Sequence, residues 1–64
     1  MEINIKQLKL AMIRKCMNPR DLSQSVGCSY ESIIQILSGR RKPSMKKIGR
    51  IAQVLDIDPK EIIE

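Results

Sequence analysis

Apolar residues recur every three or four positions along this chain, which is the spacing of amphipathic α-helices and not the alternation of strands. The first predicted helix runs from about residue 4 to 15. The residues that follow this spacing in it are Ile5, Leu8, Ala11, Met12 and Lys15. Short helices are predicted at about 19–25 and 30–37. A fourth begins after Pro43, and its predicted apolar stripe is Met45, Ile48, Ile51, Ala52 and Leu55.

Capping residues stand where these helices should begin and end. Asn18 is a predicted N-cap, because Pro19 fits the first helical position, where its missing N–H is not needed. Gly27 suits a left-handed turn after the second helix. Further predicted N-caps are Ser29, Ser44 and Asp58, the last with Pro59 and Glu61 behind it. The sequence therefore predicts an all-α fold of five short helices in one domain, residues 1–64.

The second and third helices form a distinctive pair. Their apolar residues Leu22, Val26, Ile33 and Ile36 would be buried between two helices that cross steeply, with the small Ser23 at their closest approach. Two short helices joined by a glycine-containing turn are typical of a helix-turn-helix, in which the second helix enters the DNA major groove.

Charge supports this interpretation without deciding it. The chain has 12 Lys and Arg against 7 Asp and Glu, a formal net charge of +5. Half of the basic residues fall within residues 40–50, whereas the last nine residues are mainly acidic. A basic middle suits a polyanion on one side of the domain, although a basic helix face can also be plain solvated surface.

The composition does not support an enzymatic function. The chain has no His, no phosphate-binding glycine loop and no metal-ligand cluster, so neither a cofactor nor a metal is expected. Cys16 and Cys28 are interpreted as reduced thiols of a cytoplasmic protein. No stretch is long and apolar enough to span a membrane.

Three segments resemble the Cro and phage-repressor (XRE-type) helix-turn-helix family, at residues 22–29, 33–44 and 48–57. The most specific features are the turn glycine, the Ser-Gly-Arg-Arg-Lys-Pro-Ser loop and the Ile-Ala-x-x-Leu pattern in the fourth helix. The resemblance implies a five-helix DNA-binding domain from a bacterium, phage or mobile element. It also implies that the third helix reads double-stranded DNA, commonly as a homodimer on a near-palindromic operator.

The third helix divides into two arcs at about 100° per residue. Ile33, Ile36 and Leu37 share the core arc. The candidates for reading bases lie on the opposite arc and are Tyr30, Glu31, Ile34 and Gln35. Gln35 suits adenine, Glu31 suits the cytosine amino group and Ile34 suits a thymine methyl, whereas Tyr30 suits a base edge or a phosphate.

A second set of residues would hold the DNA backbone. The hydroxyls and cations near the reading helix are the candidates, because they bind phosphate without regard to sequence. They are Asn18, Arg20, Ser29, Ser32, Ser38, Arg40, Arg41, Lys42 and Lys46, with Lys47 extending the set.

Several positions depart from the family pattern. Members usually have Gln in place of Pro19 as a phosphate anchor, a role that Asn18 or Arg20 would have to take here. They often have Gly in place of Cys16, so we expect a differently shaped turn. Many pair Arg with Glu where this chain has Met12 and Leu37, and we expect these two to pack together.

Apolar residues in excess of a small core suggest protein contacts. Those near the C-terminus, Val54, Ile57, Ile62 and Ile63, favour a homodimer through the last helix and its neighbours. Leu10, Ile13 and Ile34 favour an alternative function, in which the chain is an antitoxin or a mobile-element accessory protein that binds a protein partner.

Overall fold

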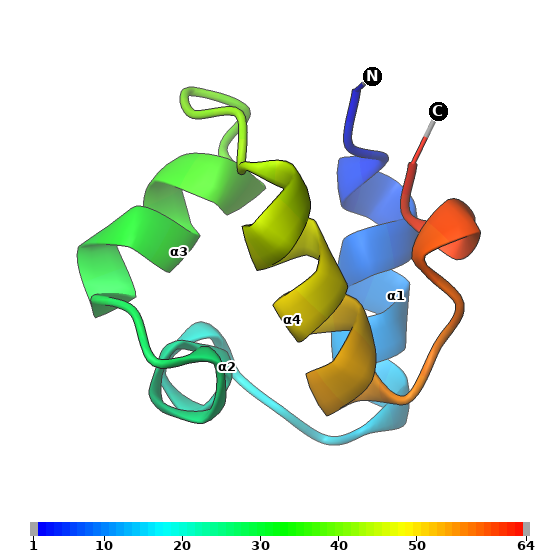
Figure 1. Cartoon of the computed structure of the whole chain (residues 1–64). Helices are drawn as coiled ribbons and strands as arrows, with labels where there is room; N and C mark the ends of the chain where they lie inside the picture. The colour runs from blue at the N-terminus through cyan, green and yellow to red at the C-terminus, as the bar shows by residue number, and fades with distance from the viewer. Residues whose placement is uncertain (1, 64) are drawn as a thin grey trace.

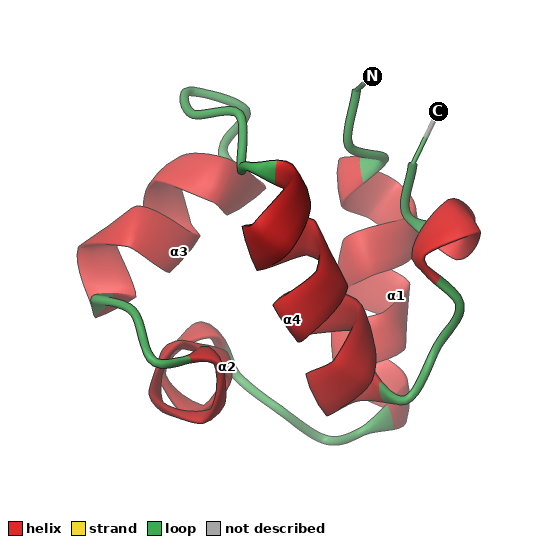
Figure 2. Cartoon of the chain, viewed as in Figure 1, coloured by secondary structure: helices red, strands yellow, loops and turns green. Residues whose placement is uncertain are grey.

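Residues 2–63, which the computed structural model describes, form four α-helices and one 3-10 turn. The elements are α1 (Ile5–Arg14), α2 (Pro19–Val26), α3 (Tyr30–Leu37), α4 (Met45–Leu55) and the 3-10 turn η1 (Pro59–Glu61) (Figure 1). Short loops join them (Figure 2). Within residues 2–63, extended backbone pairs only at an isolated bridge between Ile3 and Ile63. The all-α class is therefore confirmed.

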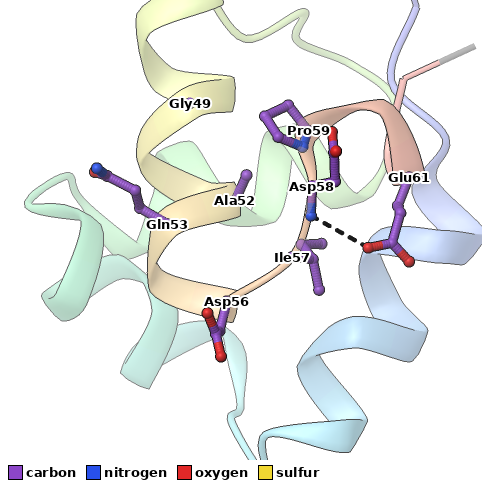
Figure 3. A pocket seen from close by; sticks show the side chains of 8 residues that line it. All are labelled: Gly49, Ala52, Gln53, Asp56, Ile57, Asp58, Pro59 and Glu61. Atoms are coloured by element: carbon purple, nitrogen blue, oxygen red, sulfur yellow. Dashed lines mark hydrogen bonds between the residues drawn. The ribbon is translucent and has the colours of Figure 1, made fainter.

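The fifth predicted helix is a single 3-10 turn. Asp58 accepts the Lys60 N–H at 3.0 Å, and its own N–H donates to the Glu61 carboxylate at 3.2 Å (Figure 3). The turn stops at Ile62, whose side chain is fully buried. Because Ile62 must point into the core, the chain leaves the helical path after one turn.

The predicted N-caps of the α-helices are confirmed. Asn18 and Asp21 form a reciprocal capping box at the start of α2, with N–H to oxygen distances of 2.8 and 3.2 Å. Ser29 accepts the Ser32 N–H at 3.1 Å, and Ser44 accepts the Lys47 N–H at 3.2 Å. These side chains satisfy backbone donors that have no partner inside the helix.

The core is aliphatic and draws on every helix. Its buried side chains are Leu8, Ala11, Met12, Leu22, Val26, Ile33, Ile36, Ile48, Ile51, Ala52, Leu55 and Ile62. Ser23 is buried as predicted, and its hydroxyl donates to the Arg20 carbonyl at 2.7 Å. The prediction that Met45 belongs to the stripe of α4 is wrong. Met45 lies at the solvent-facing start of the helix and is 76% exposed.

Two predicted turns involve left-handed backbone. Gly27 has φ +85° after α2, as predicted. Cys16 has φ +55°, the conformation that glycine favours. The expectation of a differently shaped turn is therefore wrong for this residue, since Cys16 adopts the left-handed conformation itself.

Residues near the two ends of the described chain contact each other and complete the core. The Asn4 N–H donates to the Ile62 carbonyl at 2.7 Å, and the ends lie side by side (Figure 1). Val54, Ile57 and Ile63 are half-buried against the core. The C-terminal apolar residues therefore help to close the fold, and their role in a homodimer stays a prediction.

Candidate nucleic-acid interface

Helix α3 lies along one edge of the molecule (Figure 1). Ile33 and Ile36 are buried against α2 and the rest of the core. On the other arc Tyr30 is 46% exposed and Ile34 is 36% exposed. Glu31 is also exposed, and Gln35 is half-buried. The four predicted base-reading residues therefore lie on the outward side of one helix, within reach of a ligand.

The loop after α3 folds back onto that helix. The backbone N–H groups of Arg40 and Arg41 donate to the Gln35 carbonyl at 3.0 and 3.3 Å. The Arg41 guanidinium then donates to Ser32 Oγ at 3.2 Å, and the Ser29 hydroxyl donates to the same oxygen at 2.9 Å. This brings a cation from the loop to the start of α3.

A polar hollow of about 330 Å³ results from this folding. It is lined by Ser29, Glu31, Ser32, Gln35 and Arg41. The hollow joins two predicted base-reading residues to three predicted backbone-binding residues. Such a mixture suits a nucleic acid, which presents phosphates beside base edges.

Arg20 and Tyr30 form a pair across the helix-turn-helix. The Arg20 guanidinium lies 5.2 Å from the centroid of the Tyr30 ring, within the range of a cation–π contact. The side-chain oxygen of Asn18 is engaged in the capping box, and Pro19 has no donor. Of the two residues expected to replace the usual anchor, Arg20 is therefore the one that carries a charge and is held beside α3.

Sequence reasoning missed a role for Arg50. Its guanidinium donates to the Val26 carbonyl at 3.2 Å, which joins α4 to the last residue of α2. With Lys46, Lys47 and Ser44 it surrounds a hollow beside Gly27. The one available signal was the four-residue spacing from Lys46 to Arg50, which places two cations on the same side of α4.

Two further predicted backbone contacts are also engaged within the molecule. The Ser38 hydroxyl donates to the Gln35 carbonyl at 3.1 Å. Lys42 Nζ lies 2.7 Å from the Glu2 carboxylate, and both side chains are exposed. The hydrogen bond from Lys42 lowers the pKa of Glu2 from its ordinary value, and the same bond raises the pKa of Lys42. Lys42 would have to leave Glu2 to hold a phosphate.

Comparison with known proteins follows this geometry. The sequence profile of the helix-turn-helix family matches residues 6–62. The chain belongs to the XRE-type helix-turn-helix family. Its members are DNA-binding transcription regulators, so this helix-turn-helix protein is one too. Among curated proteins no match was found.

The fold is shared with a solved structure. The restriction-modification controller protein C.AhdI from Aeromonas hydrophila superposes with a TM-score of 0.83. The two chains are 24% identical, and the match covers 89% of this chain and 86% of that one.

None of the helices within residues 2–63 of this helix-turn-helix protein has the length and apolar character needed to cross a membrane.

Proposed function

We propose that this chain is a sequence-specific repressor that reads the major groove of double-stranded DNA with α3. The proposal rests on one observation above all. Arg41 and Arg20 are held against the first turn of α3, at Ser32 and at Tyr30, two positions about 200° apart around the helix. Guanidinium groups on both sides can hold the phosphates of the two strands while the helix lies in the groove. Repression is the simpler regulation, because it requires only that the operator be occupied.

Each outward residue has a chemical role in this proposal. Gln35 donates to and accepts from one adenine, and Glu31 accepts a hydrogen bond from a cytosine amino group. Ile34 contacts a thymine methyl. Tyr30 serves two purposes, since its ring holds Arg20 while its edge faces the groove.

The remaining cations supply affinity that does not depend on sequence. Arg40 and Lys46 flank the groove from the loop and from α4, with Ser29 and Ser32 at the start of α3. We propose that the protein binds as a homodimer on a near-palindromic operator, because one recognition helix reads only a short half-site.

Selection of bound sequences from a random duplex pool tests the proposed function. We expect one enriched half-site, repeated at about one helical turn. Binding of random duplex should fall steeply as salt rises, since each phosphate contact releases counterions. Absence of binding to any duplex at low salt would refute DNA binding as the function of this chain.

Two variants separate base reading from backbone contacts. Gln35→Ala should relax preference at one base pair, with a loss of about 1–3 kcal/mol on the selected site. Arg41→Ala should instead weaken selected and random duplexes alike and make the salt dependence shallower. Fluorescence anisotropy over a salt series measures both effects. If Gln35→Ala left the selected sequence unchanged, the reading face would lie elsewhere.

A second candidate function is an antitoxin or a mobile-element accessory protein. Leu10 is 43% exposed and Ile13 is 68% exposed on α1, away from the outward face of α3. Apolar side chains of this size on the surface are typical of a protein-binding site when they cluster. The two candidates are distinguished by whether the loss of these side chains affects protein binding and spares DNA binding.

A further inference from the structure

The chain has an apolar groove where α1, α2 and α3 meet. A hollow of about 280 Å³ lies between the end of α1, the start of α2 and the end of α3. It is lined by Lys9, Met12, Ile13, Met17, Pro19 and Leu37. Almost all of its lining is apolar, unlike the polar hollow of α3. Met12 and Leu37, which we expect to pack together, both border this groove.

One wall of the groove continues onto open surface. Ile13 is 68% exposed, and Leu10 lies one helical turn before it on the outer face of α1. The opposite face of the same helix buries Leu8, Ala11 and Met12. Ile13 and Leu10 lie outside the core cluster, and their exposed parts can contact another molecule.

The groove has cations around it and no acid on α1. Lys9 lines the groove, and Lys6 lies three residues before it on this helix, which contains neither Asp nor Glu. Neither lysine has a carboxylate within ion-pair distance among residues 2–63. The groove therefore combines an apolar floor with a positive rim.

This combination argues against a second copy as the occupant. In a twofold dimer the same patch lies on both subunits, so two positively charged patches would meet. A membrane surface is also a poor fit, because the main apolar face of α1 is buried and only two of its large side chains remain exposed.

We propose that this groove binds an acidic amphipathic helix of another protein. Apolar residues of that helix at positions i, i+3, i+4 and i+7 would contact Ile13 and the groove floor. Its Asp and Glu residues would lie against Lys6 and Lys9. The methionines Met12 and Met17 suit such a site, since their flexible side chains adapt to different anchors.

A displayed library of helical peptides tests this proposal with the full chain as bait. Each peptide has about 18 residues, long enough to form helix, with apolar residues at the four anchor positions. The flanking positions are drawn equally from Glu, Lys, Gln and Ser. We expect enrichment of Glu at the flanks. The enriched peptides should bind Ile13→Gln about tenfold more weakly than the unchanged chain, as expected when an anchor contact is lost.

The matched control is Met45→Gln, because Met45 is an equally exposed apolar residue outside the groove. It should bind the peptides as the unchanged chain does, and circular dichroism should show both variants folded. The proposal is overturned if no peptide is enriched, if Lys replaces Glu at the flanks, or if Ile13→Gln leaves binding unchanged. It is also overturned if Ile13→Gln reduces self-association in sedimentation, since the occupant would then be a second copy. None of these outcomes depends on DNA binding.

Discussion

At the scale of single residues, Cys16 stores strain. An L-residue in the left-handed region costs about 1–2 kcal/mol, and glycine avoids this at the expense of a more flexible unfolded chain. Since Cys16 has φ +55°, Cys16→Gly should raise the free energy of unfolding by about 0.5–1 kcal/mol. Urea unfolding measures the change. Cys16→Ala keeps the Cβ and should bring no gain, so equal gains in both variants would assign the effect to the thiol.

The Arg20–Tyr30 pair yields a second prediction at this scale, which assumes that DNA is bound. If the ring orients the guanidinium, Arg20→Ala and Tyr30→Ala should weaken DNA binding less than additively, with a coupling of about 0.5–1 kcal/mol. Tyr30→Phe keeps the ring and should retain the coupling. A double-mutant cycle by anisotropy on a random duplex measures this. Additive losses would mean that the two residues act separately. If Tyr30→Phe abolished the coupling, the hydroxyl and not the ring would be responsible for it.

At the scale of helices, the sequence predicts features that depend on neighbouring residues. It does not predict contacts between residues that are far apart in the chain. Caps such as Asn18 and Ser44 act on N–H groups three residues away, so the sequence predicted where helices begin. The outward arc of α3 followed from its periodicity alone. The bond from Arg50 to Val26 joins residues 24 apart, and it depends on how α4 crosses α2. No short-range pattern reports that crossing, nor the return of Arg41 to Ser32.

The bond of Arg50 predicts how α4 holds the helix-turn-helix. Arg50→Met keeps an apolar stem and removes the donor to the Val26 carbonyl, so the free energy of unfolding should fall by about 1 kcal/mol. Lys46→Met makes the same charge change on the same helix without breaking a bond to α2, and should stay within about 0.5 kcal/mol. Thermal unfolding compares them. Equal effects would mean that only the charge matters.

At the scale of the whole molecule, the acidic C-terminal residues and the cations near α3 lie on different sides. The acidic residues Asp56, Asp58 and Glu61 surround a hollow between α4 and η1 (Figure 3). In Figure 1, η1 lies on the side of the molecule away from α3. A polyanion that approaches α3 therefore meets the cations near this helix, while the acidic C-terminal residues lie on the far side of the molecule. If α3 binds DNA as proposed, this arrangement would orient the protein before contact, which the net charge of +5 alone would not do.

The whole fold also depends on its C-terminal closure. Ile62 is fully buried, and its carbonyl accepts the Asn4 N–H at 2.7 Å, so the last turn holds the first helix. Ile62→Ala should lower the free energy of unfolding by about 2–5 kcal/mol. A domain of this size has only about 3–10 kcal/mol in total, so a large unfolded fraction is expected. Circular dichroism against urea measures it, with the exposed Met45→Ala as control. If Ile62→Ala and Met45→Ala had the same free energy of unfolding, the stability of the core would not depend on this C-terminal closure.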